Sequence, residues 1–557
     1  MAGRNVRPAP ASVQRNRLML RIPPAALVAA LVFAPVSLEA QQAGQPADSL
    51  FRASDACIAC HNDLTTSSGQ DISIGYDWRS SMMGNSARDP YWQAGVRRES
   101  LDHPTASAAI EDKCSICHMP MARYMAHVAG LSGEVFTNLP VGQSEAPGAL
   151  LAGDGVACSV CHQIKGDNLD SPESFTGGFV VDHENNLGQR IVHGPFEIDG
   201  GRQRIMRSAS GFEPNEAPHI QSSALCGSCH TLYTHALNAA GEEVGELPEQ
   251  MPFREWLHSA YKEERSCQDC HMPKVEGESP ITGVLSQPRE NVSRHVFRGG
   301  NFFMPRLLNR YRKELGVVAL PQELEATASR SVEHLGTNSA TVNIEDVNVE
   351  DGHLTLQVSV ENKAGHKLPT AYPSRRAWLH VRVEDRNGRL LFESGRLQEN
   401  GAIAGNDNDE DPERYEAHYA RIDSQEQVQI YEAIMEHYAG GPTTGLLNGV
   451  SYLKDNRLLP RGFAKRSADA DVAVHGTAAT DADFQGGSDR VQYSIDVPGS
   501  AGPFTTAVEL LYQPVSYRWA RNLEQYDAAE PQRFVGFYDS MTGATHQLLA
   551  RTTITTP

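Results

Sequence analysis

CIACH (57–61) is the first of five copies of one pattern, which returns as CSICH (114–118), CSVCH (158–162), CGSCH (226–230) and CQDCH (267–271). The ten cysteines of the 557-residue chain all lie in these copies, and a histidine always follows the second cysteine. Paired thiols can form short disulfides, and four thiols can hold zinc, but neither reading needs that histidine. Cys-x-x-Cys-His is the attachment signal for c-type haem, because two thiols bond the porphyrin and the histidine binds the iron. The sequence therefore predicts five covalent haems.

The predicted attachment residues fall into five sets of two cysteines and one histidine. They are Cys57, Cys60 and His61; Cys114, Cys117 and His118; Cys158, Cys161 and His162; Cys226, Cys229 and His230; and Cys267, Cys270 and His271.

Outward from the motifs, residues 51–337 are expected to form one pentahaem domain. The motif starts are separated by 57, 44, 68 and 41 residues, which is too uneven for a stacked repeat. Frequent glycine, proline and serine between motifs predict loops and short helices around each haem, without long strands. Apolar residues at helical spacing predict two longer helices at the end of this region, at 301–316 and 320–336.

After residue 338 the apolar period changes to two, which is typical of half-buried strands. It is clear in ATVNIEDVNVED, HLTLQVSVEN, AWLHVRVED and VQYSIDV. Asn387-Gly388 predicts a two-residue hairpin turn, and a helical or irregular excursion is expected around 405–470. The fold class predicted is α+β: a mostly helical and loop multihaem cytochrome domain, followed by an antiparallel β-sandwich-like domain at 338–557.

The N-terminus reads as a secretory signal peptide. Five arginines precede the apolar run ALVAALVFAPVSL (26–38), and cleavage is expected after Ala40, which leaves a polar linker at 41–50. An uncleaved anchor is the alternative, but the run is short for a membrane span, and no later segment is long and apolar enough to cross. Attachment of c-type haem outside the bacterial cytoplasm also favours an exported, periplasmic or extracellular protein.

The formal charge is −20, and removal of residues 1–40 would make it −24, because five arginines and one glutamate leave. Such a surface disfavours nucleic acid and anionic lipid and would attract basic redox partner proteins. Simple solubility of a secreted protein explains the acidity equally well.

Each haem iron needs a second axial donor for six-coordination. The distal candidates are His193, His219, His258, His295, His103, His127 and, beyond the attachment region, His366; Met83, beside Met82, is the sulfur candidate for the first haem. A lone histidine is more often a surface or satisfied core residue than a ligand. Gly365, Pro369 and Pro373 predict that His366 sits in a rigid loop that reaches a haem, with Arg375 and Arg376 offsetting propionate charge beside it.

An acidic loop in the second region offers a different kind of site. GNDNDEDPERYEAHY (405–419) places Asp407, Asp409 and Asp411 at alternate positions, and calcium prefers such oxygen donors. The glycine and glutamate of an EF-hand loop are missing at their offsets. The loop is therefore either a calcium site or a solvated acidic loop.

With these motifs the chain resembles multihaem c-type cytochromes, in the superfamily of the tetrahaem carrier of ammonia oxidisers, hydroxylamine oxidoreductase and pentahaem nitrite reductase. The resemblance rests on the CxxCH set, on CHMP at 117–120 and 270–273, and on GDGVACSVCHQI, SRHVFRGGNFFM and GHKLPTAYPSRRAW. It implies an exported electron carrier with closely packed, mostly bis-histidine haems. Nitrite reductases of this kind bind their catalytic haem through a motif ending in lysine, whereas all five motifs here end in histidine.

The function expected is electron transfer along five haems without substrate chemistry. One alternative is an oxidoreductase that acts on a small nitrogen or sulfur species at a five-coordinate haem. Another is a filament subunit, whose haem series continues into neighbouring copies.

Overall fold

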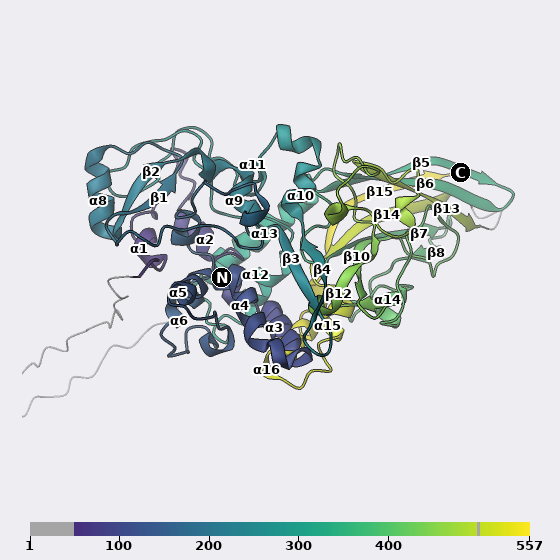
Figure 1. The fold of residues 1–557 in the computed structure, drawn as a ribbon. Helices are drawn as coiled ribbons and strands as arrows, with labels where there is room; N and C mark the ends of the chain where they lie inside the picture. The colour runs from purple at the N-terminus through teal and green to yellow at the C-terminus, as the bar shows by residue number, and fades with distance from the viewer. Residues whose placement is uncertain (1–48, 498–501) are drawn as a thin grey trace, which may run out of the picture. The chain divides into compact units, whose positions relative to one another are not determined.

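Short helices joined by long loops surround the five motifs in the first half of the chain (Figure 1). The structure is a computed structural model that describes residues 49–497 and 502–557. The helices are α1 (Asp55–Ile58), α2 (Ile74–Arg79), α3 (Pro90–Asp102), α4 (Ser107–His118), α5 (Pro120–Val128), α6 (Ala149–Gly153), α7 (Cys158–Cys161), α8 (Gly200–Ser210), α9 (Ser223–Gly227), α10 (Pro252–Leu257), α11 (Cys267–His271), α12 (Phe303–Arg310) and α13 (Pro321–Asn338). The helix predicted at 320–336 is confirmed as α13, whereas the one predicted at 301–316 ends early, at Arg310.

Two small strand pairs interrupt the helices, which the sequence did not indicate. Strand β1 (Arg190–Gly194) pairs in parallel with β2 (Phe212–Glu216), and β3 (Leu232–Leu237) pairs antiparallel with β4 (Glu243–Gln250). The predicted loop-rich character of this region otherwise holds.

The predicted signal peptide and residues 41–48 of the predicted linker lie outside the described residues. Ser49 and Leu50, the last two residues of that linker, have relative exposures of 1% and 3%. Leu50 packs in one apolar cluster with Trp78, Met121 and Val160. The linker prediction is therefore wrong at its end, because an apolar leucine next to polar residues is buried by segments far away in the sequence.

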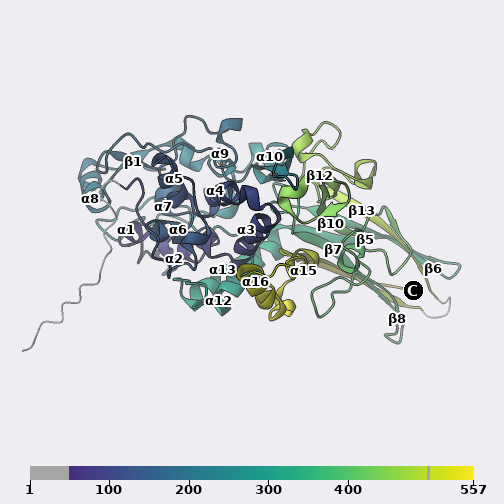
Figure 2. The same ribbon diagram turned by 60° about the horizontal axis from the view of Figure 1, so that its bottom comes forward.

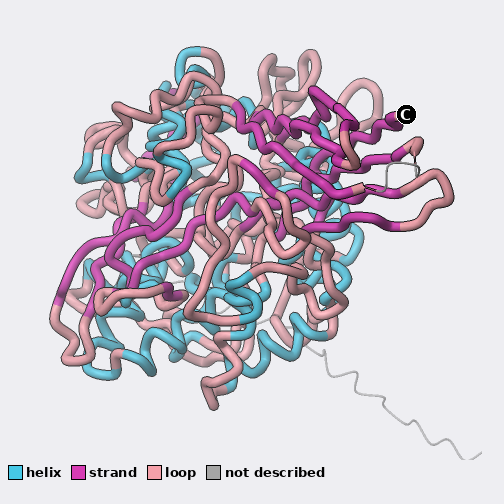
Figure 3. Tube along the Cα trace, turned by 90° about the vertical axis from the view of Figure 1, so that its right-hand side faces the viewer, coloured by secondary structure: helices cyan, strands magenta, loops and turns pink. Residues whose placement is uncertain are grey.

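Strands dominate the second half (Figure 3). They are β5 (Ala340–Glu350), β6 (His353–Asn362), β7 (Arg376–Glu384), β8 (Leu390–Ser394), β9 (Arg421–Ile422), β10 (Ile430–His437), β11 (Pro442–Thr443), β12 (Gly449–Asp455), β13 (Ser488–Asp496), β14 (Phe504–Gln513) and β15 (Gln547–Thr556). A seven-stranded sheet runs β11-β10-β7-β14-β15, with β12 on β10 and β8 on β7, and a four-stranded sheet runs β5-β6-β13-β9.

The inner faces of the two sheets share one apolar core. Along β6, Leu354, Leu356, Val358 and Val360 are buried while residues between them are more exposed, because side chains alternate across a strand. They lie in the same cluster as buried residues of β7 and β13. The period-two prediction is confirmed for β5, β6, β8 and β13, whereas β7 alternates only from Leu379 onward and β14 only up to Leu510.

Two details of the second half differ from expectation. The segment 405–470 contains β10, β11 and β12, which extend the larger sheet, so the predicted excursion is wrong there. The turn at Asn387-Gly388 exists, but its loop has three residues: Asp385 N–H donates to Arg389 O at 2.9 Å, with Gly388 at φ 74°, a conformation that glycine favours. Helices α14 (Asp407–Glu410), α15 (Tyr517–Arg521) and α16 (Ala529–Asp539) complete the chain.

The two halves belong to one compact unit, residues Pro46–Pro557. Helix α16 packs on α3 (Figure 2), where Arg97 Nε lies 2.9 Å from Glu530 Oε2. Strand β4 contacts β12, and the Tyr452 hydroxyl donates to Pro248 O at 2.9 Å. The boundary predicted at 337/338 therefore marks a change of secondary structure within this unit. Among the described helices, none has the length and apolar character needed to cross a membrane.

Candidate haem-binding site

Each of the five motifs lies on or at the end of a short helix. Cys57 is on α1, the second motif ends α4, and α7, α9 and α11 carry the others. Helix α11 begins cleanly because the Ser266 side chain accepts from Asp269 N–H, while the Asp269 side chain accepts from Ser266 N–H, which satisfies two amides of the first turn. The local helical conformation thus fixes the spacing of the cysteines within a motif.

Four of the five motifs face a common cavity. A cavity of about 750 Å³ is lined by the cysteines and histidines of the first four motifs, by Gln268 of the fifth and by Met272, which follows the fifth. Apolar side chains such as Trp78, Val160 and Ile164 also line it. All ten thiols are free and half-buried. An apolar cavity with paired thiols and a histidine at each of four motifs has the donor set and the apolar lining that covalent haem needs.

The zinc alternative finds no support in the part of the chain that the structure describes. There, one group of three or more metal-binding side chains comes together, namely His418, Asp481 and Asp489, and it contains no cysteine. The pairs of thiols do not converge into a four-sulfur site, which structural zinc would need.

Four of the five motif histidines are oriented by backbone carbonyl groups. The Nδ1 atom of His61 lies 2.6 Å from Ile281 O, and that of His118 lies 3.0 Å from Ser86 O. The Nδ1 atom of His162 lies 2.6 Å from His193 O, and that of His271 lies 2.5 Å from Arg298 O. A carbonyl at Nδ1 requires the proton there, which leaves Nε2 as the free donor to a metal. Burial lowers the pKa of His118 and of His271 to about 4, so both imidazoles stay neutral, as coordination needs.

Thiols of different motifs lie beside one another. Cys57 hydrogen-bonds Cys158, and this contact is the largest cause of the raised pKa of Cys57. In the same way Cys117 contacts Cys229, and Cys226 contacts Cys267. The first motif is therefore next to the third, and the fourth is next to both the second and the fifth.

Two of the distal candidates stand opposite a motif histidine. The ring centres of His162 and His295 are 6.3 Å apart with planes inclined by 21°, and those of His271 and His366 are 6.2 Å apart at 13°. Two imidazoles that bind one metal from opposite faces, with N–metal bonds of about 2 Å, have ring centres about 6 Å apart. Nδ1 also contacts a carbonyl in both: Ser293 O for His295 and Lys367 O for His366. These two pairs fit axial ligation.

His334 also lies near His271, at 6.2 Å and 59°. Its Nδ1 accepts from the Asn338 amide at 3.4 Å, which places the proton on Nε2 and makes that nitrogen a poor donor to iron. His366 is the better partner of His271.

The other candidates have different surroundings. His103, His127 and His258 use Nε2 toward Asn448, Asp112 and Asp469 at 3.1, 3.0 and 3.2 Å. His219 Nε2 lies 2.8 Å from Ile164 O, and its ring centre is 4.7 Å from that of His193. His193 and Met83, with Met82, line the cavity. The structure does not place any of these rings opposite a motif histidine.

The second motif has an aromatic neighbour that the sequence did not single out. Trp92 stacks on His118 with ring centres 4.3 Å apart and planes inclined by 1°. Among the described residues, no second histidine ring faces His61, His118 or His230 in the way seen at His162 and His271. No spacing pattern relates Trp92 to CSICH, so this contact could not be found without tertiary structure.

Polar and ionisable side chains line the same cavity between the second and fourth motifs: Asp89, Tyr91, Glu99, Tyr372 and Arg375. Burial raises the pKa of Asp89 to about 6 and raises that of Glu99. The pKa of His230 is lowered by burial and then by the Arg375 charge. Arg375 thus lies near a motif, as expected, whereas Arg376 is buried elsewhere.

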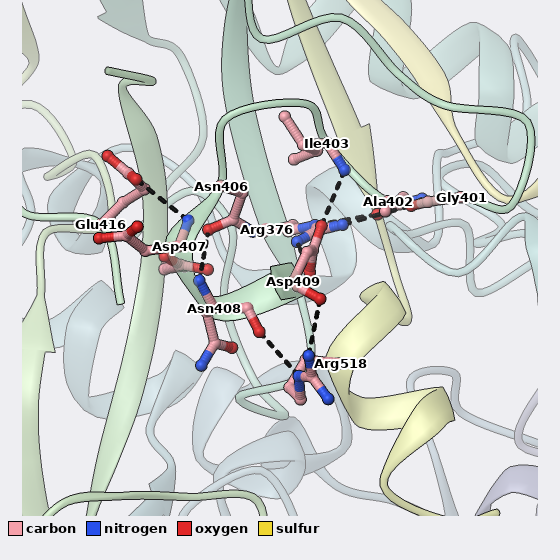
Figure 4. A network of polar contacts seen from close by, with 12 residues as sticks. Arg376, Gly401, Ala402, Ile403, Asn406, Asp407, Asn408, Asp409, Glu416 and Arg518 are labelled. Atoms are coloured by element: carbon pink, nitrogen blue, oxygen red, sulfur yellow. Dashed lines mark hydrogen bonds and ion pairs between the residues drawn. The ribbon is translucent and has the colours of Figure 1, made fainter. Parts of the chain in front are cut away.

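The acidic loop does not gather its three carboxylates. Asp409 accepts from Arg376 Nη1 at 2.8 Å and from Ile403 N–H at 2.8 Å (Figure 4). Asp407 pairs with Arg414, and Asp411 accepts from Glu413 N–H. The calcium interpretation is therefore wrong, because Arg376, 33 residues away in the chain, supplies the positive charge at Asp409 that calcium would have brought.

The chain was compared with protein families, curated proteins and solved structures. No family model and no curated protein matches this chain. Among solved structures, it is similar to a penta-haem cytochrome c552 from Thermochromatium tepidum, with a TM-score of 0.50 and 14% identity, over 91% of this chain and 100% of that one. The mixed α+β fold is therefore similar to that of this penta-haem cytochrome.

Proposed function

We propose that this protein carries five covalent haems and transfers electrons among them. The observation that carries the proposal is the set of five Cys-x-x-Cys-His motifs, four of which line one apolar cavity, with Nδ1 of four motif histidines held by backbone carbonyls. Bound haem would supply one-electron redox chemistry. The chain's own part is to attach each haem by two thiols, orient the proximal imidazole and exclude water.

The thiol contacts suggest an order for the electrons. The first and third motifs are neighbours, and the fourth is next to both the second and the fifth. Cys161 and Cys229 are also close enough for the second thiol to raise the pKa of the first, after burial, so the third and fourth motifs are linked. The fourth haem is then a junction of three arms, which end at the first, second and fifth haems.

For axial ligation we propose His295 opposite His162 and His366 opposite His271. Histidine on both faces of an iron prevents small molecules from binding there and suits a carrier. The strand region would then supply one of the ligands, since His366 lies in the loop between β6 and β7. The acidic composition favours basic redox partners, and a cleavable signal at 1–40 would export the protein.

A second function is favoured by the cavity between the second and fourth motifs. Among the described residues, no histidine ring faces His118 or His230 as His295 faces His162, and Asp89, Glu99, Tyr372 and Arg375 line the same cavity. Carboxyl groups with raised pKa values can hold and release protons near neutral pH. An oxidoreductase acting on a small nitrogen or sulfur species would use such groups.

The haem count is tested by mass spectrometry of protein made with a working haem-attachment system. We expect a chain that begins near Gln41 and carries five covalent haems. A mass with three haems or fewer would contradict the proposal.

The ligation and the choice between carrier and enzyme are tested by spectroscopy. His366→Ala should convert one haem in five from low to high spin while all five remain attached. His258→Ala is the matched control, because that ring is tied to Asp469 and should leave the spectrum unchanged. Carbon monoxide binding to the reduced wild-type protein would favour the enzyme, and its absence the carrier.

A further inference from the structure

Four ionisable side chains form a fully buried cluster beside His366. Glu255 comes from α10, Asp455 ends β12, Arg457 follows it, and Lys367 is the residue after His366. The exposed fractions of their side chains are 0%, 3%, 8% and 0% in that order. Lys367 Nζ lies 2.7 Å from Asp455 Oδ2, Arg457 Nη2 lies 2.7 Å from the same oxygen, and Arg457 Nη1 lies 2.9 Å from Glu255 Oε1.

Such a cluster is costly to bury, and it persists only when every charge is matched. Here two cations face two anions. Burial acts to raise the pKa of Asp455, but Arg457 and Lys367 together bring it below its ordinary value. Apolar residues of similar volume would fill the same space at no electrostatic cost, so packing alone does not explain the charges.

The cluster is bonded to the backbone that carries His366. Glu255 Oε2 accepts from the backbone N–H of Lys367 at 3.1 Å and from the Thr370 hydroxyl at 2.5 Å. On the other side, the Asn362 amide donates to His366 O at 2.9 Å. Leu368 N–H then donates to Leu458 O at 2.9 Å, so the backbone is held at His366 and at the two residues that follow it.

We infer that the cluster of Glu255, Lys367, Asp455 and Arg457 positions His366 opposite His271. The inference rests on the proposed ligation by His366. Glu255 belongs to the segment between the fourth and fifth motifs, whereas the other three residues belong to the strand region. Directional bonds across this boundary fix the angle of the His366 ring and its distance from His271, whereas apolar contacts would fix neither.

The test uses Glu255→Gln and Lys367→Met in the full five-haem protein. Each variant should keep five attached haems, but the high-spin, carbon monoxide-reactive fraction should rise from near none toward one haem in five. The reduction potential of that haem should also shift, while the other four keep theirs. Thr370→Val, which removes only one bond to Glu255, should give a smaller change in the same direction and remains informative if a charge variant fails to fold.

The matched control is Asp409→Asn. Asp409 and Arg376 form an ion pair of equal burial, with 1% and 2% of their side chains exposed, but they contact Gln513 and Arg518 rather than the His366 loop. This variant should lose stability without a spin change. If the cluster variants lose stability in the same way and keep a fully low-spin spectrum, the positioning role is overturned. If His366→Ala itself leaves the spectrum unchanged, the ligation proposal fails first.

Discussion

The two halves of the molecule fill their interiors by different means. The two sheets of the second half close over one large apolar cluster, which helices α12 and α13 of the first half also join, and along β6 Leu354, Leu356, Val358 and Val360 have relative exposures of 0–1%. Four motifs of the first half instead line a cavity of about 750 Å³, with small separate apolar clusters around it. With haem attached as we propose, the motif region would depend for its core on groups attached after synthesis, whereas the sheets would not.

The largest effect should follow the loss of one attachment site. Cys158→Ala with Cys161→Ala would remove the third haem, and the cavity beside Val160 and Ile164 would lose its filling. We expect one haem fewer by mass and a loss of unfolding free energy above the roughly 2–5 kcal/mol typical of a buried large-to-alanine change. Thermal unfolding checks it. A four-haem protein with an unchanged melting temperature would contradict the claim that haem fills the interior of the first half.

A core substitution in the strand region should act more modestly. Leu356→Ala should cost about 2–5 kcal/mol, because a fully buried side chain is removed from a closed core. All five haems and their visible spectrum should remain as in the wild type, as measured by absorption and denaturant unfolding. Altered spectra at mild denaturant would mean that the haem region cannot hold its ligands without the sheets.

The smallest effect concerns a buried carboxyl of the strand region and depends on pH. Burial raises the pKa of Asp489 to about 7; its Oδ2 accepts from Tyr431 at 2.7 Å and from Gln429 at 3.1 Å, while Oδ1 has no hydrogen-bond partner and lies 3.9 Å from His418 Nε2. The native state then binds a proton that the unfolded chain releases near pH 4. The contribution of this carboxyl to wild-type stability therefore falls as pH rises from about 4 to 7, and it changes no further above that.

Asp489→Asn mimics the protonated acid and keeps both bonds at Oδ2. Its stability relative to wild type should improve by on the order of 2 kcal/mol between pH 5 and pH 7. Melting temperatures at pH 5 and pH 8 measure it. The exposed Asp423→Asn should differ from wild type equally at both values, and a flat difference for Asp489→Asn would refute the argument.

Sequence patterns predicted the parts of the fold that periodicity specifies. Helix α13 and strands β5, β6 and β8 each carry one buried face, so their apolar residues repeat at the expected period. Strand β10 was missed because it lies inside the larger sheet and six of its residues, from Ile430 to Met435, are buried in succession, which removes the alternation. The short motif helices have too few residues to show any period.

The site residues also divide into those that a sequence pattern predicts and those that it does not. The attachment motifs are local and are visible in the sequence, whereas a facing residue depends on the tertiary fold. Among the candidates, only the tertiary structure distinguishes His295 and His366, whose rings lie 6.3 and 6.2 Å from a motif histidine, from His258, whose Nε2 is bonded to Asp469. Trp92, stacked on His118, carries no sequence signal at all. The partner of Asp409, likewise, is Arg376 on a distant strand.

The contact of the first motif with residues 281–283 has a consequence for the order of events in biogenesis. His61 Nδ1 meets Ile281 O at 2.6 Å, and Gly283 N–H donates to Cys60 O at 2.7 Å, more than 200 positions later in the chain. A chain that emerges N-terminus first cannot complete this motif until all five have appeared. The first motif to emerge is thus the last to gain its native contacts. The enzymes that attach haem would therefore act on it while the chain around it is still unfolded.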